Sequence, residues 1–205
     1  MAERPKDLVH AIGFAVAGGR SQRMGQDKAL LPWGTTTLLD HTLARLAEVC
    51  TEVRILSGPQ PRYTDRGLPV DVDTVVDAGP LSGLLAGLQR LGDAPGLFLA
   101  IDMPFVPAAL LRSLVAWSES CDVVVPVTAD GAHPLCAAYR ASCLEPVRRR
   151  LAAGERKMTC FWPDVRVRQV GKAELRAFGE PGKLVQNLNT ADDYRRAQES
   201  RRQSR

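Results

Sequence analysis

Residues 12–28, IGFAVAGGRSQRMGQDK, decide how the rest of the chain is interpreted. The first part, from Ile12 to Ala17, is an apolar run typical of a β-strand that is buried on both faces. The second part is polar, and its glycines allow the backbone to turn N–H groups toward a ligand: Gly18, Gly19 and Gly25. A buried strand that ends in such a loop predicts an anion site, and the anion that fits best is a nucleotide phosphate.

The cations of this loop support the same interpretation. Arg20, Arg23 and Lys28 would neutralise an anion held by the backbone N–H groups. The loop does not follow the GxGxxG pattern of dinucleotide-binding proteins. It does not follow the GxxxxGK[ST] pattern of P-loop proteins either, because Ala29 comes after Lys28. The loop therefore predicts a phosphate site of another class.

The length and composition of the chain are those of one α/β domain. Its 205 residues can bury a substantial core, and 45% of them are hydrophobic while 24% are charged. We expect a single domain over residues 1–205, with flexible ends at about 1–10 and 199–205. No apolar run is long enough to span a membrane, and the N-terminus MAERPKDLVH lacks a signal-peptide core. We therefore expect a cytoplasmic protein with no membrane partner.

Charge and cysteine content argue against other classes of protein. The net charge is +4, and much of it comes from the tail RRAQESRRQSR at 195–205, so the rest of the chain is nearly balanced. Such a balance is not that of a nucleic-acid-binding protein. The five cysteines form no CxxC pair, which argues against a zinc site or a disulfide framework. We interpret them as small buried residues in a reducing compartment.

Strands and helices are predicted to alternate along the chain. Strands are predicted at 12–17, 53–57, 70–73, 96–101, 121–127, 134–140 and 165–168, with a turn at 32–34 and a hairpin turn at 128–131. Helices are predicted at about 38–49, 81–91, 107–118, 141–153 and 191–198, with Thr36 or Thr37 as the first N-cap and Thr190 as the last.

This order predicts an α/β fold, namely a three-layer, Rossmann-like open sheet that is mostly parallel and has helices on both faces. In such a sheet, ligands bind at the carboxyl ends of the strands. Asp73, Asp102 and the loop at 18–28 each follow a predicted strand. We therefore expect them to converge on one crevice.

Several stretches of the chain resemble one family of enzymes. The loop AGGRSQRMGQDKALL at 17–31 is similar to the signature loop of nucleotidyltransferases, and it looks most like that of the molybdenum cofactor guanylyltransferases. Further stretches that resemble this family are spread over nearly the whole chain: GPLSGLLAGL at 79–88, IDMPFVP at 101–107, HPLCAAYR at 133–140, AGERKM at 153–158 and LNTADDY at 188–194.

The resemblance implies a reaction and its partners. GTP and molybdopterin-bound molybdenum would give the guanine dinucleotide form of the cofactor and pyrophosphate, with Mg²⁺ as the metal cofactor. The terminal phosphate of the acceptor is already an anion at neutral pH, so catalysis would depend on positioning and charge neutralisation rather than on a strong base. We expect a monomer that exchanges the molybdenum cofactor with delivering and accepting proteins.

The resemblance also implies the catalytic residues. Lys28 and Arg23 would stabilise charge on the phosphates, and Asp102, directly after an apolar strand, would hold Mg²⁺. The alternative for Asp102 is a cap of the turn before Pro104. Asp27 would orient Lys28 rather than contact the ligand.

Nucleotide-binding residues are implied in the same way. They are Val16, Ala17, Gly18, Gly19, Gly25, Lys28, Asp73, Gly79, Gly83 and Asp102. Gly79 and Gly83 would admit the guanine ring against the backbone. The alternative for this pair is that they are ordinary turn and helix-packing glycines.

Two of these nucleotide contacts stay open at the level of sequence. Asp71 and Asp77 lie near enough to Asp73 to compete for its role. The family has an asparagine just after the second strand, whereas this chain has Ser57-Gly58. That departure leaves the corresponding ribose or base contact without an obvious residue.

For the acceptor, the resemblance points to Asn187, Asn189 and Arg156. The two amides precede the last predicted helix and would bind a polar heterocycle or phosphate, while Arg156 would meet the acceptor phosphate. The alternatives are turn or cap residues for the asparagines and a surface cation for Arg156.

Other functions share the same loop. A cytidylyltransferase for the same cofactor, or a sugar-phosphate nucleotidyltransferase, would bind a triphosphate in the same way. A nucleotide-binding module without turnover belongs to a different class, and the presence of Lys28, Arg23 and Asp102 argues against it.

Overall fold

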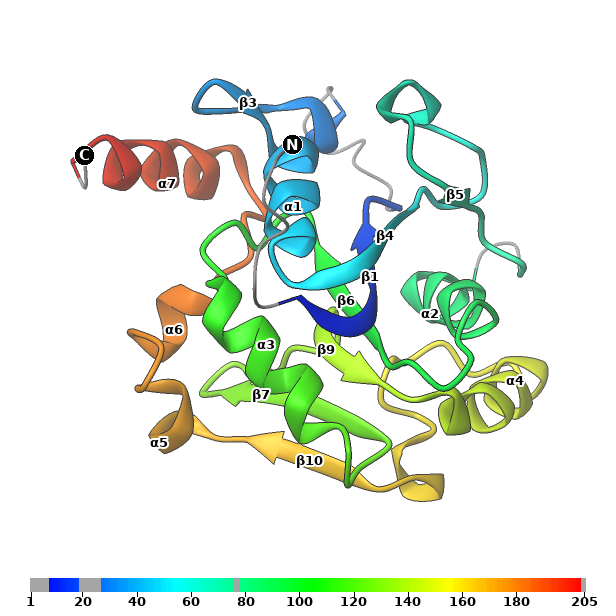
Figure 1. The fold of residues 1–205 in the computed structure, drawn as a ribbon. Coiled ribbons are helices and arrows are strands. Elements are labelled where there is room, and N and C mark those ends of the chain that lie inside the picture. The colour runs from blue at the N-terminus through cyan, green and yellow to red at the C-terminus, as the bar shows by residue number, and fades with distance from the viewer. Residues whose placement is uncertain (1–7, 19–26, 76–77, 204–205) are drawn as a thin grey trace.

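The fold is built on one eight-stranded sheet (Figure 1). The computed structural model describes residues 8–18, 27–75 and 78–203. The strands follow the order β10-β7-β9-β6-β1-β4-β5, and β8 pairs with β7. They are β1 (Val9–Val16), β4 (Cys50–Leu56), β5 (Val70–Asp71), β6 (Gly96–Ala100), β7 (Val123–Thr128), β8 (Gly131–Ala132), β9 (Cys136–Tyr139) and β10 (Val167–Val170).

The strand directions confirm a mostly parallel sheet. Strand β1 runs parallel to β4 and β6, β4 runs parallel to β5, and β7 runs parallel to β10. Strand β9, within the strand predicted at 134–140, is antiparallel to both of its neighbours, β6 and β7, and β8, which was not predicted, forms a hairpin with β7. The apolar strand at β6 is buried at every position, as expected for a central strand.

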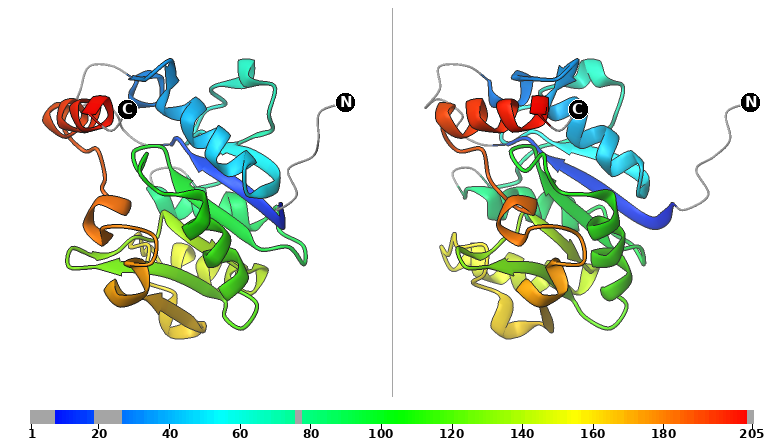
Figure 2. Two further views of the ribbon diagram at one scale, coloured as in Figure 1. Left: turned by 60° about the vertical axis from the view of Figure 1, so that its left-hand side comes forward. Right: turned by 90° about the vertical axis from the view of Figure 1, so that its left-hand side faces the viewer.

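Helices cover both faces of the sheet, which confirms the three-layer arrangement (Figures 1 and 2). Alternate residues of β1 divide between two cores: Ala15 packs with α1 and α3, whereas Phe14 packs with α2 and α4. The first face carries α1 (Leu38–Ala47), α3 (Ala108–Trp117), α5 (Lys172–Leu175) and α6 (Pro181–Leu184), and the second carries α2 (Pro80–Leu88) and α4 (Leu144–Ala152).

Local sequence signals explain where these helices begin and how closely they pack. Thr37 caps α1 through a capping box with Asp40, as the sequence predicts. Gly87 of α2 lies against the Phe98 ring. A Cβ at this position would approach Phe98 Cζ to 2.6 Å. Large side chains on β6 therefore require a glycine on the helix that covers them.

Several boundaries differ from the sequence prediction. Residues Pro32–Trp33, expected in a turn, form β2 and pair with β3 (Thr36–Thr37). The helix expected over 141–153 starts with the 3-10 turn Ala141–Cys143, and β10 lies two residues beyond the strand expected at 165–168. Short helices α5 and α6 were not predicted. The remaining 3-10 turns are η2 (Lys28–Leu30), η3 (Thr64–Arg66) and η5 (Trp162–Asp164).

The last helix, α7 (Ala191–Gln203), is longer than predicted because it packs on the β2–β3 hairpin (Figure 2). Tyr194 and Gln198 both donate to the carbonyl of Pro32, and the Arg201 guanidinium lies 5.4 Å from the Trp33 ring centroid. Thr190 is its N-cap, as predicted. Flexible ends were expected at about 1–10 and 199–205. Most of the described residues in these two ranges lie in β1 and α7.

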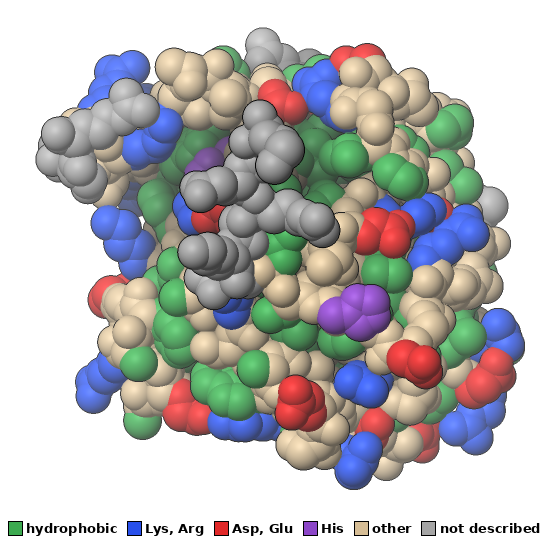
Figure 3. Space-filling model, in the orientation of Figure 1, with side chains coloured by type: hydrophobic (Ala, Val, Ile, Leu, Met, Phe, Trp, Pro, Cys, Tyr) green, Lys and Arg blue, Asp and Glu red, His purple; other side chains and the backbone are tan. Residues whose placement is uncertain are grey.

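Charge and cysteines are distributed over the described residues as follows. None of the helices in the described parts of the chain is long and apolar enough to cross a membrane. Positive and negative side chains are interspersed over the face shown in Figure 3. The five cysteines are free thiols, and Cys50, Cys136 and Cys143 are buried, which raises the pKa of each of these three thiols to about 12.

Asp71, at the end of β5, is a buried structural carboxylate. Its side chain is 2% exposed, and it accepts hydrogen bonds from Arg54 Nε and Arg90 Nε, each at 2.7 Å. Burial alone would raise the pKa of Asp71, but the two guanidinium groups outweigh it, so the pKa lies below 3.8. The ion pairs join β4, β5 and the end of α2.

We predict that Asp71→Asn lowers the free energy of unfolding by about 2 kcal/mol at pH 7, because two guanidinium groups lose their charged partner. Since the folded pKa lies below the unfolded value, this contribution is present above about pH 4 and is lost as the pH falls further. Urea titrations at pH 7 and thermal melts down to pH 3 would measure it. Glu52→Gln, which loses only an exposed pair with Arg54, is the control and should change stability little.

Candidate active site

Four neighbouring parallel strands end in line at the same edge of the sheet. The register pairs Val16 of β1 with Leu56 of β4 and with Ala100 of β6, and it pairs Leu56 with Asp71 of β5. The segments that follow these strands are therefore side by side. This edge is where the sequence predicts that Asp73, Asp102 and the loop at 18–28 converge.

Lys28 and Asp102 meet at this edge. Lys28 Nζ donates to Asp102 Oδ2 at 3.0 Å, although the two residues are 74 positions apart. Their side chains are 15% and 22% exposed. An ammonium and a carboxylate that are both partly accessible at the ends of parallel strands suit the binding of a phosphate and of a metal ion that accompanies it.

The backbone of Asp102 also holds the segment that carries the two predicted acceptor asparagines. The N–H of Leu188 donates to the Asp102 carbonyl at 2.8 Å, and the Leu188 side chain is fully buried. Asn187 and Asn189 flank this anchor, and Asn189 is exposed whereas Asn187 is half-buried. The structure thus brings both asparagines to the loop that carries Asp102.

The start of the Gly-rich loop is held by the segment after β4. The N–H groups of Ala17 and Gly18 both donate to the Leu56 carbonyl at 2.9 Å. A Cβ on Gly18 would lie 2.7 Å from Gly58 N, so the two backbones touch. Gly58 has a φ of +83°, a conformation that favours glycine. Its contact with Gly18 was missed in the sequence, where Ser57-Gly58 was noted only as a departure from the family's asparagine.

Asp73 forms no ion pair with the described residues, unlike the nearby Asp71. Its N–H donates to the Gly58 carbonyl at 2.8 Å, and its Oδ1 would lie 3.4 Å from a Cβ on Gly83. Burial raises the pKa of Asp73. Asp71 is occupied by arginines, and Asp77 lies outside the described residues, so of the two described carboxylates Asp73 is the one free to meet a ligand.

Gly79 and Gly83 lie at the start of α2, and the structure separates their roles. Gly79 precedes the helix with a φ of +63° and a ψ of −155°, a conformation that side-chain-bearing residues rarely adopt. Gly83 lies in the helix beside the Asp73 carboxylate. Ser82 Oγ accepts from the N–H of Val75 at 3.0 Å and fixes the path between Asp73 and the helix.

Of the other predicted site residues, Arg156 is not joined to this arrangement. Arg156 is exposed, and its guanidinium donates to the carbonyls of Leu151 and Glu155 in its own segment after α4. Val16 and Ala17 are buried at the end of β1 and the start of the loop. Gly19, Arg23 and Gly25 lie outside the described residues.

The side chains that could bind a metal ion are compatible with an ion that takes most of its ligands from a substrate. In the described part of the chain, no group of three or more His, Cys, Asp or Glu side chains is arranged to hold a metal. A hard cation bound between substrate phosphates and water needs only one or two carboxylates. Asp102, partly exposed at the strand edge, is a carboxylate of this kind.

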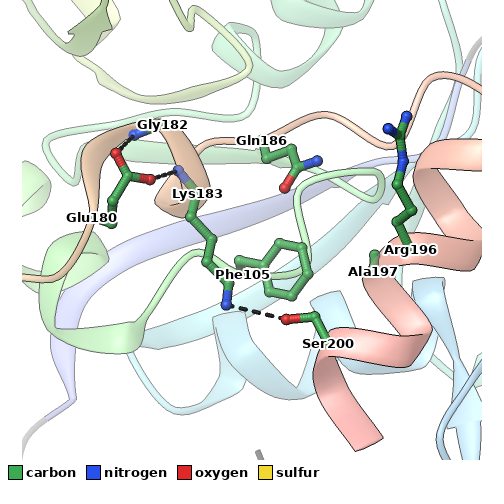
Figure 4. Close-up of a pocket in the computed structure, with 8 residues that line it drawn as sticks. All are labelled: Phe105, Glu180, Gly182, Lys183, Gln186, Arg196, Ala197 and Ser200. Atoms are coloured by element: carbon green, nitrogen blue, oxygen red, sulfur yellow. Dashed lines mark hydrogen bonds between the residues drawn. The ribbon is translucent and has the colours of Figure 1, made fainter. Parts of the chain in front are cut away.

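A cavity of about 430 Å³ adjoins this region between α6 and α7 (Figure 4). It is lined by Phe105, Glu180, Gly182, Lys183, Gln186, Arg196, Ala197 and Ser200. Lys183 Nζ donates to Ser200 Oγ at 3.2 Å, and the Glu180 carboxylate accepts from backbone N–H groups of α6. The Lys183–Ser200 hydrogen bond joins the two helices, whereas Glu180 caps the start of α6.

The family of the chain follows from comparison with known proteins. Residues 13–165 match the MobA-like NTP transferase domain family. This match covers more than half of the 205 residues, so the chain belongs to this family of nucleotidyltransferases. The resemblance seen in the signature loop is therefore confirmed, and so is the α/β fold that it implied.

Particular relatives are similar over nearly their full length. A probable molybdenum cofactor guanylyltransferase from Pelotomaculum thermopropionicum is 37% identical over 190 residues, which are 93% of either chain. The crystal structure of molybdopterin-guanine dinucleotide biosynthesis protein A from Archaeoglobus fulgidus has a TM-score of 0.79 at 23% identity, covering 94% of this chain and 99% of that one. Rv0371C of Mycobacterium tuberculosis, in complex with manganese, has a TM-score of 0.65 at 22% identity, covering 94% and 100%.

We predict that Gly18→Ala lowers the free energy of unfolding by about 1–3 kcal/mol, because its Cβ meets the backbone of Gly58 rather than a side chain that can move aside. Urea-induced unfolding would measure the loss. Gly92→Ala is the matched control, since a Cβ there has no neighbour within 4 Å. Equal stability of the two variants would contradict the close contact between the two loops.

Proposed function

We propose that this protein transfers GMP from GTP to the molybdenum cofactor, forming molybdopterin guanine dinucleotide and releasing pyrophosphate. The observation that carries the proposal is the contact of Lys28 with Asp102 at the carboxyl edge of a nucleotidyltransferase sheet. The name of the 37% identical relative, a probable molybdenum cofactor guanylyltransferase, supports the choice of nucleotide and acceptor.

The proposed chemistry needs charge neutralisation more than proton transfer. The acceptor phosphate is the nucleophile and attacks the α-phosphorus of GTP, and the bond to the bridging oxygen of pyrophosphate breaks. Lys28 would stabilise the negative charge that develops on pyrophosphate. Arg23 is proposed as a second cation on the strength of the sequence resemblance. No general base is required, because the acceptor phosphate is already ionised.

We propose Asp102 as the protein ligand of Mg²⁺. When bound, this ion supplies positive charge to the phosphate oxygens at the reacting centre. The chemistry of the carboxylate and its partial exposure support this assignment. The manganese complex of the Mycobacterium tuberculosis protein further supports the use of a divalent metal ion.

Binding of the nucleotide is proposed along the same edge of the sheet. Backbone at Val16, Ala17 and Gly18, together with Gly19 and Gly25, would surround the phosphates. The guanosine would lie toward α2, where the Asp73 carboxylate has no charged partner among described residues and Gly83 leaves space beside it. Gly79 would let the chain enter α2 close to the base.

The acceptor is proposed on the other side of Asp102. Asn187 and Asn189 are supported there by the hydrogen bond between Leu188 and Asp102. Arg156 stays a prediction from resemblance. We also propose a monomeric, single-domain, cytoplasmic enzyme that receives the molybdenum cofactor from one protein and passes it to another.

We predict that pyrophosphate is released when the protein is mixed with GTP, Mg²⁺ and molybdenum cofactor, and that CTP supports this release at least about tenfold less well. The reason is the proposed base site beside Asp73 and α2. A coupled pyrophosphate assay with GTP, CTP and UTP would measure the preference. A preference for CTP would favour a cytidylyltransferase. Binding of nucleotide without release by folded protein would favour a non-catalytic module.

We predict that Asp102→Asn lowers the rate of pyrophosphate release by at least about a hundredfold, because the amide lacks the charge that holds the metal ion. The fold should be retained, since the substitution keeps the size of the side chain. The assay with GTP, run beside a thermal melt, would measure both effects. Asp93→Asn, exposed in the loop before β6, is the control. Near-normal turnover of Asp102→Asn would remove this residue from the metal site.

A further inference from the structure

Asp27, the residue before Lys28, is fully engaged by the protein. Its carboxylate accepts from the N–H of Ala29 at 3.1 Å and thereby caps the turn η2 that begins with Lys28. The phenol of Tyr63 donates to both carboxylate oxygens, at 3.0 and 2.9 Å. Arg62 forms an ion pair with the same carboxylate. Asp27 therefore has no oxygen left that is free of a protein donor.

Tyr63 adopts a backbone conformation that costs energy. Its φ of 64° and ψ of 27° are left-handed, and it is the one residue other than glycine with a positive φ among the described residues. A side chain in this region is strained by about 1 kcal/mol or more. A glycine would relieve the strain, so what offsets it must be the interactions that the tyrosine side chain makes.

Those interactions are the packing of the ring in the hydrophobic core and the hydrogen bonds of its hydroxyl to Asp27. The Tyr63 side chain is buried, and the Arg62 guanidinium lies 4.8 Å from its ring centroid. Burial and the hydrogen bond to Asp27 raise the pKa of Tyr63, so the phenol stays protonated and donates. Arg66, three residues later, donates to Asp40 of α1 at 2.8 Å and fixes the segment to the body of the protein.

The segment from Ser57 to Gly67 thus touches both described ends of the Gly-rich loop. Gly58 contacts Gly18, where the chain leaves β1, and Tyr63 with Arg62 holds Asp27, where the chain reaches Lys28. One segment after β4 therefore contacts both ends, and Arg66 ties that segment to α1. Neither Arg62 nor Tyr63 was singled out in the sequence.

We propose that Arg62 and Tyr63 are positioning residues that act through Asp27 to place the Lys28 ammonium at the phosphate site, an inference that rests on the proposed nucleotidyl transfer. They do not contact substrate. Lys28 Nζ donates to Asp102 Oδ2 at 3.0 Å, and the capping of η2 by Asp27 fixes the backbone from which the Lys28 side chain extends. Such preorganisation increases transition-state stabilisation, because no rearrangement is needed during the reaction.

Tyr63→Phe tests the proposal, since it keeps the ring and removes the hydroxyl. We expect kcat for pyrophosphate release to fall about ten- to thirtyfold and the affinity for GTP to fall as well, because a displaced ammonium also holds the phosphates less well before the reaction. The matched control is Asp65→Asn. Asp65 lies on η3, the turn that Tyr63 precedes, and pairs with Arg66 rather than with Asp27, so this variant should behave as the parent protein. A kcat of Tyr63→Phe within twofold of the parent would overturn the proposal.

A double-mutant cycle separates positioning of Lys28 from a general effect on the fold. If Tyr63 acts through Lys28, then Tyr63→Phe in a Lys28→Ala background should cause no further loss of kcat. If the fold-losses in kcat caused by the two single substitutions multiply in the double variant, the proposal is overturned. Thermal melts of the same variants would report any common loss of stability.

A second readout keeps this test independent of the proposed reaction. If the parent protein turns over no nucleotide, the proposed function fails, but the rise in Tm caused by Mg²⁺ with GTP, CTP or ATP still reports phosphate binding. Tyr63→Phe and Lys28→Ala should then reduce that rise equally, and the double variant should reduce it no more. An undiminished rise in Tyr63→Phe, or no nucleotide-induced rise in the parent, would overturn the inference.

Discussion

The shared register of four parallel strand ends is the constraint on which the rest of the structure depends. Because β1, β4, β5 and β6 stop in line, the segments that follow them must occupy one edge of the sheet. Each of these segments then contacts another one: Gly18 meets Gly58, the Gly58 carbonyl accepts from Asp73, and Lys28 meets Asp102. The site is thus an outcome of strand pairing, and its side chains need little further support to converge.

The Lys28–Asp102 ion pair contributes little to the stability of this edge. Its partners are 15% and 22% exposed, and partly buried pairs lose in desolvation much of what they gain in attraction. The pairing of Asp71 with two arginines differs, because that carboxylate is buried and its partners tie β4, β5 and α2 together. A pair that does little for stability, yet lies where four parallel strands end, suits the binding role proposed for it, because phosphate and a divalent cation are complementary to those two charges.

The sequence predicted the parts of this molecule that local patterns determine. The apolar β6, the cap at Thr37 and the glycines of α2 follow from composition and spacing, and so did the meeting of Asp73, Asp102 and the loop at one edge. The β2–β3 hairpin was missed because α7, more than 150 positions later in the chain, donates to Pro32. Tyr63 was missed for the same reason, since its partner Asp27 is 36 positions away and no residue pattern marks a left-handed tyrosine.

The proposed site divides recognition between parts of the fold that are placed by different contacts. The proposed phosphate site depends on strand ends and on a loop whose two described ends contact the segment after β4, so the central sheet determines its position. Base and acceptor recognition would depend on the start of α2 and on the segment before α7, which are placed by core packing and by hydrogen bonds such as Leu188 to Asp102 and Val75 to Ser82. Substitutions in those two segments can change the choice of base or acceptor without disturbing the sheet edge. A loop sequence that identifies a triphosphate therefore carries little information about the nucleobase, and that information must be sought in residues around Asp73 and Asn187.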